Sequence, residues 1–341
     1  MRRRSRTAVL ESDAGTPVRP ALSGNFGMIL VTGGPNFIGR SVIRQLTAYG
    51  YTVRSLLRPS QKSPSLPPGV SVDVTLAALT DRRGVRAAMV DIDTVIHLSD
   101  HVGPTHTSRH LDTEVEGTRN LAEACADAGV ERMIYLSYLG ADRSAAYPAM
   151  RAKAIAEEHL RASGVPYTIL RTAILFGRDD FFTVPMAEML SVAPLFFPMP
   201  GDGSVLLQPL WIEDLATCIT WILDERETIG ATFEIGGPEF LSFRQILELI
   251  MRAASSPRIV FSTRPPYLRI AARFFEWLLP KSPVTPLWVD YLAVNRTADL
   301  NTLPSVFGLQ PSRMEGNLDY LHERNWGWEL LAQQFSRGRG Q

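Results

Sequence analysis

The residues most suited to chemistry form a glycine-rich turn, VTGGPNFIGR, at residues 31–40. A tight turn into a helix N-terminus presents free backbone N–H groups and the positive end of the helix dipole, which together hold a pyrophosphate. Gly33 would let backbone approach a phosphate, and Gly39 would let the helix pack closely on the sheet. Asn36 stands where a third glycine is usual, and we expect it to adopt the left-handed conformation that Asn tolerates. The alternative is a purely structural turn. The predicted cofactor contacts in this turn are Gly33, Asn36, Phe37, Ile38, Gly39 and Arg40.

Arg58 is a second candidate contact, because it ends the next apolar run, Leu56-Leu57-Arg58. NAD-specific sites usually place Asp or Glu at this point to hold the ribose hydroxyls, whereas Arg accommodates a 2′-phosphate. Together with Arg40, Arg58 favours NADP(H) as the cofactor and leaves NAD(H) as the alternative. A solvated surface arginine is the other interpretation of Arg58.

The elements that would position these residues follow from hydrophobic periodicity. Short β-branched runs alternate with helical patterns from Met28 onward, and glycines close three of the helices. Strands that are apolar throughout indicate a parallel sheet covered on both faces, which binds ligands beyond the carboxyl ends of its strands. The pattern predicts an α/β fold with a Rossmann-type doubly wound parallel sheet. The expected strands are 28–32, 51–57, 70–76, 94–99, 130–137 and 165–177, and the expected helices are 38–50, 82–90, 114–129 and 148–164.

Composition narrows the function classes. Lys plus Arg and Asp plus Glu both number 35, so no global field favours nucleic acid as a partner. The two cysteines, Cys125 and Cys218, lie in apolar helical patterns without a CxxC motif, which argues against a disulfide or a metal site. No apolar stretch reaches the ~18 residues of a spanning helix. We therefore expect a cytoplasmic protein, with peripheral attachment at the inner face of the membrane as the alternative.

The chain order predicts four segments. Residues 1–27 are expected to be a disordered tail or a mis-assigned start, and residues 28–180 an NAD(P)-binding Rossmann domain. Residues 181–330 are expected to complete that domain and to form a substrate lobe. Residues 331–341 are expected to be a polar tail.

Six phrases together carry a resemblance to a known family. They are ILVTGGPNFIGR, DIDTVIHLS, EVEGTRNLAEACADAGVERMIYLS, MRAKAIAEEHLRASGVPYTILRTAILFGRDD, GDGSVLLQPLWIEDLA and TFEIGGPEFLSFRQILELI. The chain resembles the extended and atypical short-chain dehydrogenases/reductases, which are NmrA-like or epimerase-like NAD(P)-binding proteins. It is most similar to the branch that contains the nucleotide-binding accessory subunit of respiratory complex I and its bacterial relatives. The resemblance implies a Rossmann domain with a small C-terminal substrate lobe.

The resemblance also implies where catalysis would take place. Active members carry a Tyr-x-x-x-Lys pair after the fifth strand and a Ser or Thr at that strand's end; the Tyr exchanges a proton with the substrate, and the Lys holds the nicotinamide ribose. Lys153 matches the family's Lys, but Ala149 stands where the Tyr would be. Tyr147 lies at the predicted helix start, and Ser137 and Tyr138 end the fifth strand. The catalytic candidates are thus Lys153, Tyr147, Ser137 and Tyr138, with packing as the alternative role of Tyr138.

Two further departures concern the cofactor. After the third strand the family usually has a Gly-Asp pair whose Asp binds the adenine, but this chain has alanines at 77 and 78. In the helix after the fourth strand, Glu114 stands where the extended members have an Asn. We expect packing and backbone near Leu79 to hold the adenine. Leu98 and Ser99, after the fourth strand, would line the adenosine ribose. Lys153 is also predicted to contact the cofactor.

In the second half, the proline-broken apolar stretch 194–200 would suit a loop over an apolar substrate, such as a quinone, an isoprenoid or an aromatic compound, or else a turn in the lobe core. The mostly apolar helix at 267–279 is expected to be buried against the Rossmann domain, with contact to a membrane surface or a partner as the alternative.

Three functional hypotheses follow. The first is a dinucleotide-binding, weakly active or silent protein that serves as an accessory or sensor protein of redox metabolism, with a respiratory complex as a candidate partner. The second is an active NADPH-dependent reductase of an apolar carbonyl or quinone. The third, a nucleotide-sugar epimerase or dehydratase, is supported by fold similarity alone.

Overall fold

The structure is a computed structural model that describes residues 27–60, 66–98, 108–278, 289, 291–322, 324 and 326–329. The tails predicted at 1–27 and 331–341 lie outside the described residues, apart from Gly27. Ser99, one of the predicted cofactor contacts, also lies outside them.

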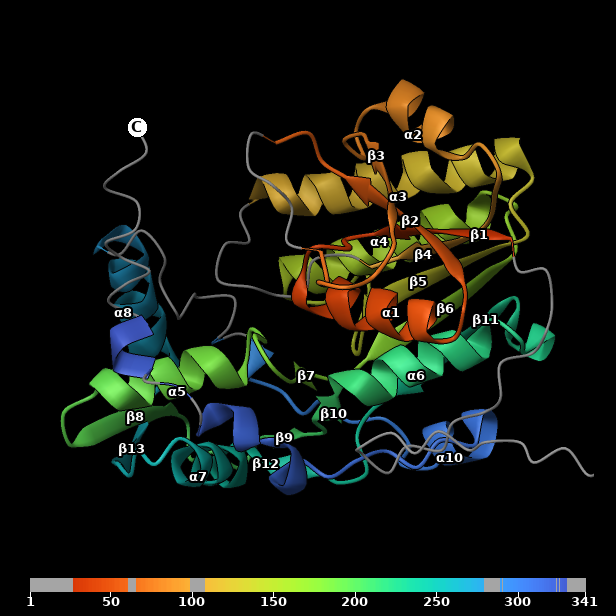
Figure 1. Cartoon of the computed structure of the whole chain (residues 1–341). Coiled ribbons are helices and arrows are strands. Elements are labelled where there is room, and N and C mark those ends of the chain that lie inside the picture. Colours follow the sequence, from red (N-terminus) through yellow and green to blue (C-terminus); the bar gives the residue numbers. More distant parts are fainter. Residues whose placement is uncertain are drawn as a thin grey trace, which may run out of the picture.

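The fold is built on a parallel sheet of seven strands (Figure 1). These are β1 (Met28–Thr32), β2 (Thr52–Leu57), β3 (Asp73–Leu76), β4 (Ile92–His97), β5 (Arg132–Tyr138), β6 (Tyr167–Thr172) and β11 (Ala231–Ile235). Their order in space is β11-β6-β5-β4-β1-β2-β3. The strand order reverses between β1 and β4, and a doubly wound sheet binds its ligand at such a point. The predicted fold class is confirmed.

Helices cover both faces of the sheet (Figure 1). On one face lie α1 (Phe37–Ala48) and α6 (Ile212–Ile222), whose apolar side chains form one core with the sheet. On the other face lie α2 (Arg82–Ala88), α3 (Ser108–Ala128) and α4 (Pro148–Ala162), which form a second core. The amphipathic periodicity of these helices therefore directs one apolar stripe of each toward the sheet.

The strand predicted at 165–177 divides into two elements. β6 ends at Thr172, and the following β7 (Leu175–Phe176) leaves the sheet to pair with β10 (Leu210–Trp211). The single-strand prediction was therefore wrong for its second half. This departure carries the chain from the sheet into the C-terminal lobe.

The lobe has its own apolar core beside the carboxyl end of the sheet. It contains α5 (Thr183–Val192), α7 (Phe243–Ala253), α8 (Pro265–Leu278) and two small strand pairs. The pairs are β8 (Phe196–Pro200) with β13 (Ile259–Thr263), and β9 (Leu206–Leu207) with β12 (Leu241–Ser242). Beyond the lobe, α10 (Thr302–Phe307) contributes to the sheet core shared with α1 and α6. Three short 3-10 helices complete the described elements: η1 (Arg226–Thr228), η2 (Glu315–Asn317) and η3 (Asp319–Leu321).

Candidate functional site

The glycine-rich turn links β1 to α1, with Asn36 as the N-cap of the helix. Asn36 has φ −76° and ψ 171°, so the expectation of a left-handed Asn36 was wrong. Gly33 takes the positive φ of the turn, 72°. Because Asn36 remains extended, its Oδ1 accepts a hydrogen bond from the Gly39 N–H at 2.7 Å. The turn therefore forms without a third glycine.

Close packing also requires glycine at positions 33 and 39. A Cβ on Gly39 would lie 2.2 Å from the Gly33 carbonyl oxygen, and a Cβ on Gly33 would lie 2.2 Å from the Leu98 carbonyl oxygen. Gly39 thus packs the helix against the turn itself rather than against the sheet. Phe37 and Ile38 are buried, which leaves the backbone N–H groups of the first helical turn as the donors for a ligand.

The other predicted cofactor contacts surround the carboxyl end of the sheet. Arg58 follows β2 and is exposed. The Leu79 carbonyl accepts a hydrogen bond from Asn120 Nδ2 at 3.0 Å, which fastens the segment after β3 to α3. Asp81 caps α2 by accepting from the Arg83 and Gly84 N–H groups. Asp81 is therefore the N-cap residue of α2.

Lys153 is enclosed within the protein. Its side chain is 3% exposed, and Nζ donates to Glu114 Oε1 at 2.9 Å and to the Leu136 carbonyl at 3.0 Å. Nζ also lies 4.8 Å from the ring centroids of both Tyr135 and Tyr138. The ammonium is therefore held by a carboxylate, a carbonyl and two aromatic rings.

The charges of this cluster set the protonation states of its members. Burial alone would raise the pKa of the Glu114 carboxyl, but the Lys153 charge holds this pKa below its ordinary value. The Tyr135 hydroxyl donates to Glu114 Oε1 at 2.6 Å, and burial together with that carboxylate raises the pKa of Tyr135 well above its ordinary value. The cluster thus has an ionised acid, a bound ammonium and a phenol that retains its proton.

Ser137 belongs to a different buried cluster. Its Oγ donates to Glu157 Oε1 at 2.6 Å, and Arg171 binds both oxygens of that carboxylate at 2.8 and 3.0 Å. Burial would raise the pKa of Glu157, yet its hydrogen bonds from Arg171 and Ser137 leave it below its ordinary value. The structure therefore places Ser137 with Glu157 and Arg171, whereas it brings Lys153 and Tyr138 together.

Tyr147 and Ala149 lie at the start of α4. Tyr147 is the half-buried N-cap residue of that helix, and Ala149 is buried. The guanidinium of Arg296 lies 5.9 Å from the Tyr147 ring centroid and 4.4 Å from that of Tyr291. Arg296 is buried and donates to the Leu139 carbonyl at 3.0 Å, while its Nη2 has no hydrogen-bond partner among the described residues. A buried guanidinium with one unsatisfied nitrogen therefore lies just beyond β5.

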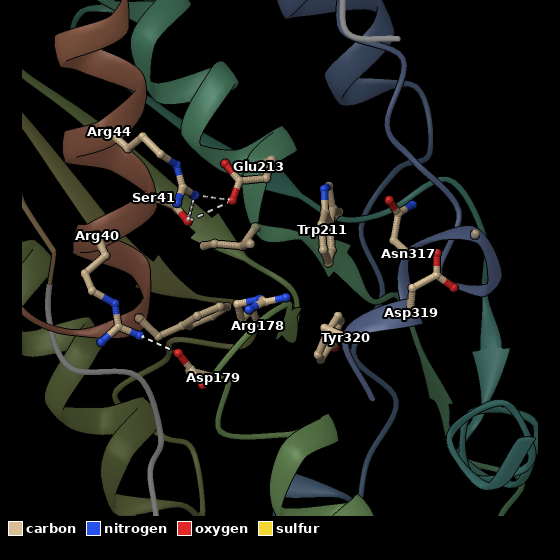
Figure 2. Close-up of a pocket in the computed structure, with 13 residues that line it drawn as sticks. Arg40, Ser41, Arg44, Arg178, Asp179, Trp211, Glu213, Asn317, Asp319 and Tyr320 are labelled. Carbon is tan, nitrogen blue, oxygen red and sulfur yellow. Dashed lines mark hydrogen bonds and ion pairs between the residues drawn. The ribbon is translucent and has the colours of Figure 1, made fainter. Parts of the chain in front are cut away.

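A pocket of about 420 Å³ opens beside the glycine-rich turn, between α1, the start of α6 and the segment that contains η2 and η3. Figure 2 shows Arg40 reaching Asp179, whose carboxylate lies at 3.3 Å, and Arg44 reaching Glu213 at 2.6 Å. Trp211 and Tyr320 form the facing aromatic wall. The Arg40 side chain therefore belongs to this pocket.

Hydrogen bonds fix the aromatic wall in place. The Tyr320 hydroxyl lies 2.6 Å from Thr183 Oγ1 and 3.3 Å from Asp180 Oδ2. Asp180 is buried and also accepts from backbone N–H groups at the start of α5. Burial raises the pKa of the Asp180 carboxyl. Hydrogen bonds thus hold one wall of the pocket in place. On the opposite side, Phe37 and Arg40 of the first turn of α1 line it.

The sequence analysis did not identify the charged residues that bind or neighbour the catalytic candidates. Glu114 was noted only as a departure from the family, although a buried lysine at position 153 requires an acid. Glu157 and Arg296 were not singled out. The available signal for Glu114 was that Lys153 lies among the alanines of the helix, Ala149, Ala152, Ala154 and Ala156, on a stretch expected to pack against the sheet.

The described part of the chain contains no group of His, Cys, Asp or Glu arranged to hold a metal ion. None of its helices is long and apolar enough to cross a membrane.

Comparisons with known proteins agree with this geometry. A family model described as NAD(P)H-binding matches residues 33–181. NADH dehydrogenase [ubiquinone] 1 alpha subcomplex subunit 9, mitochondrial, of Arabidopsis thaliana is 29% identical over 69% of this chain and 60% of its own length. Photosystem II assembly factor Ycf39 of Synechocystis is 25% identical over 86% of this chain and 90% of its own.

A solved UDP-glucose 4-epimerase from Thermotoga maritima, crystallised with UDP-glucose, superposes with a TM-score of 0.66 at 19% identity, over 89% of this chain and 99% of its own. At that identity, the likeness concerns the fold alone. The chain spans 60–64% of the length of the first three curated relatives.

Proposed function

We infer the function of this chain from its membership of the extended and atypical short-chain dehydrogenases/reductases, whose NAD(P)-binding fold it shares. We propose that it binds NADP(H) and acts as a weakly active or silent accessory or sensor protein of redox metabolism. The observation that carries this proposal is the enclosure of Lys153 by Glu114 and the Leu136 carbonyl.

Two features leave the family's proton relay, a lysine and a tyrosine, incomplete in this chain. A catalytic lysine must present its ammonium to the nicotinamide ribose and to a phenol. Here the ammonium is neutralised by the carboxylate of Glu114, whose side chain is only 15% exposed, and Ala149 supplies no phenol. Tyr135, whose ring lies beside Lys153, donates its hydroxyl to the same carboxylate. The cofactor would then bind without the tyrosine that protonates the substrate in active members of the family.

The preference for NADP(H) rests on Arg58. It follows β2, where a carboxylate would otherwise hold the ribose hydroxyls, and its exposed guanidinium has no ion-pair partner among the described residues. An arginine in that position suits the 2′-phosphate of NADPH.

The proposed setting follows from the relatives. One is named as a subunit of a ubiquinone-reducing NADH dehydrogenase and another as a photosystem II assembly factor. These names support an accessory role beside a membrane-bound redox complex. We accordingly propose a cytoplasmic protein that is peripheral at the inner face of the membrane.

Titration with NADPH and NADH, followed by nicotinamide fluorescence in the presence and absence of a simple quinone, tests the proposal. We expect NADPH to bind more tightly than NADH, and we expect no oxidation above background. Arg58→Glu should remove the preference for NADPH, whereas the matched control Arg226→Glu, an exposed arginine of η1, should leave it unchanged. Failure of both nucleotides to bind would overturn the proposal.

An active reductase of an apolar carbonyl or quinone is the second candidate function. It is favoured by the unsatisfied Arg296 Nη2, which lies near Tyr147 and would hydrogen-bond a substrate oxygen. Quinone-dependent NADPH oxidation that is lost in Tyr147→Phe or Tyr138→Phe, but retained in the exposed control Tyr267→Phe, would establish this function. The nucleotide-sugar epimerase hypothesis has only the fold in its favour.

A further inference from the structure

Helix α8 exposes large apolar side chains on one side. Tyr267, Ile270, Phe274 and Trp277 are 62%, 68%, 54% and 80% exposed, and we call these four residues the α8 aromatic face. Their spacing of three or four residues places them on one face of the helix. The rings of Phe274 and Trp277 lie in contact, with centroids 6.0 Å apart.

The opposite side of α8 packs inward. Ala272 is buried, and Leu268 and Ala271 are half-buried. Figure 1 shows α8 on the side of the lobe remote from the seven-stranded sheet. The expectation that this helix is buried against the Rossmann domain was therefore wrong. Contiguous exposed aromatic side chains mark an interaction surface.

Charge indicates what the surface contacts. Arg264, Arg269 and Arg273 are exposed on or next to α8, and Glu276 is the only acidic residue in the helix sequence. The chain as a whole has a formal net charge of zero, so this positive excess is local. A basic and aromatic helix face complements a surface that is both apolar and anionic.

We propose that the α8 aromatic face lies in the interface of an anionic phospholipid bilayer. Tyr267 and Trp277 have rings suited to the headgroup level, while Ile270 and Phe274 would enter the acyl boundary. The arginines would reach the lipid phosphates beside them. With 14 residues the helix is too short to span a bilayer, so it lies in the plane of the interface.

A second copy of the chain fits this surface less well. A twofold interface places the same patch against itself, and the arginines of α8 would then face their own equivalents. That repulsion is absent when the opposing surface is anionic lipid. The proposal requires neither nucleotide binding nor catalysis, although it gives the proposed accessory protein a site of membrane attachment.

Vesicle co-sedimentation of the full chain tests the proposal. The probes are vesicles of phosphatidylcholine alone and of an equimolar mixture with phosphatidylglycerol. We expect stronger binding to the anionic vesicles and weaker binding as salt is added. Trp277→Ser should lower the partition coefficient about ten-fold, since its ring buries the most surface. Arg273→Gln should lower it about five-fold on anionic vesicles only.

Matched controls lie elsewhere on the surface. Trp328→Ser replaces another tryptophan that is 71% exposed, and Arg226→Gln replaces an exposed arginine of η1; both should bind vesicles like the wild type. An unchanged far-UV circular dichroism spectrum would show that each variant is folded.

Three outcomes would overturn the proposal. They are no binding to either kind of vesicle, equal losses in the α8 and control variants, and a dimer in light scattering that Trp277→Ser dissociates. The last outcome would assign the face to a second copy of the chain. Because the NADPH titration is read separately, failure here leaves the proposed nucleotide function standing.

Discussion

Asn36 contributes both to helix stability and to the phosphate turn, and two substitutions separate these roles. Asn36→Ala removes the acceptor of the Gly39 N–H, so we expect the free energy of unfolding to fall by about 1 kcal/mol. Asn36→Asp keeps an acceptor and adds a negative charge that the helix N-terminus tolerates. That charge should repel the cofactor pyrophosphate and weaken NADPH binding roughly ten-fold or more. Urea unfolding and nicotinamide fluorescence measure the two effects, and wild-type affinity in Asn36→Asp would contradict the placement of the phosphates.

The buried pair of Glu114 and Lys153 predicts a strongly non-additive pair of substitutions. Glu114→Gln leaves a buried ammonium, and Lys153→Met leaves a buried carboxylate, so each should lower the free energy of unfolding by about 3–5 kcal/mol. The double variant should lose much less than the sum, because it leaves neither charge unpaired. Denaturant unfolding of all four proteins gives the coupling energy.

The exposed pair of Arg143 and Glu158, 3.0 Å apart, is the control, and its coupling should stay below about 1 kcal/mol. Since the Lys153 charge holds the pKa of Glu114 below its ordinary value, the pair stabilises the fold above that value and loses this contribution as the pH falls. Glu114→Gln should therefore be less sensitive to acid than the wild type. Additive single losses would mean that the pair carries no special energy.

Residue-level prediction succeeded where chemistry is local and failed where it joins distant parts of the chain. The turn from Gly33 to Gly39 follows from residues within seven positions of one another. The enclosure of Lys153 depends on Glu114, 39 positions away, and was invisible to spacing on one helix. The conformation of Asn36 was mistaken, because the sequence alone does not show that Gly33 takes the positive φ and leaves Asn36 free to cap the helix.

At the scale of elements, periodicity located the four helices α1 to α4 and six of the seven strands. It missed β11, whose five residues, ATFEI, are short and mostly half-buried and give no continuous apolar run. It also joined β6 to β7, because the segment stays apolar while the chain leaves the sheet. An apolar run indicates that a segment is buried but not which sheet it joins, so the boundary between β6 and β7 left no signal in the pattern.

Helix α6 provides a pH-dependent prediction through Asp214 in its first turn. Asp214 accepts hydrogen bonds from the Ser312 N–H at 2.6 Å and from the Ser312 hydroxyl at 3.2 Å, and burial raises its pKa to about 6. The folded state then holds a proton that the unfolded chain has released, so stability falls as the pH rises from about 4 to about 6. Asp214→Asn keeps an acceptor without the titration and should be more stable than the wild type near neutral pH, on the order of 2 kcal/mol.

Urea unfolding at several pH values from about 4 to about 8 measures this difference across the titration. Glu227→Gln, at an exposed acid of η1, should follow the wild-type curve throughout. Parallel curves for Asp214→Asn and the wild type would show that Asp214 does not hold a proton in the folded state.

At the scale of the whole molecule, the chain passes repeatedly between the sheet cores and the lobe core. It leaves the sheet at β7, returns as α6 and β11, leaves again through α7, and returns as α10. The predicted boundary between the Rossmann domain and the lobe, at residues 180 and 181, therefore remains a prediction. We expect the Rossmann domain and the lobe to unfold together. Because the chain crosses between their cores several times, unfolding one core would displace strands and helices of the other.

This coupling predicts that NADPH, bound at the Rossmann end, protects the lobe as well. At about one hundred times Kd, the ligand should add about 2.7 kcal/mol to the free energy of unfolding. Amides that exchange only through global unfolding should then exchange about one hundred-fold more slowly. Hydrogen exchange followed by mass spectrometry would show this slowing in α1, beside the phosphate turn, and equally in α7, whose Ile246, Leu247 and Ile250 are fully buried in the lobe. Slowing confined to α1 would mean that the lobe unfolds independently of the Rossmann domain, which would contradict the expected coupling between them.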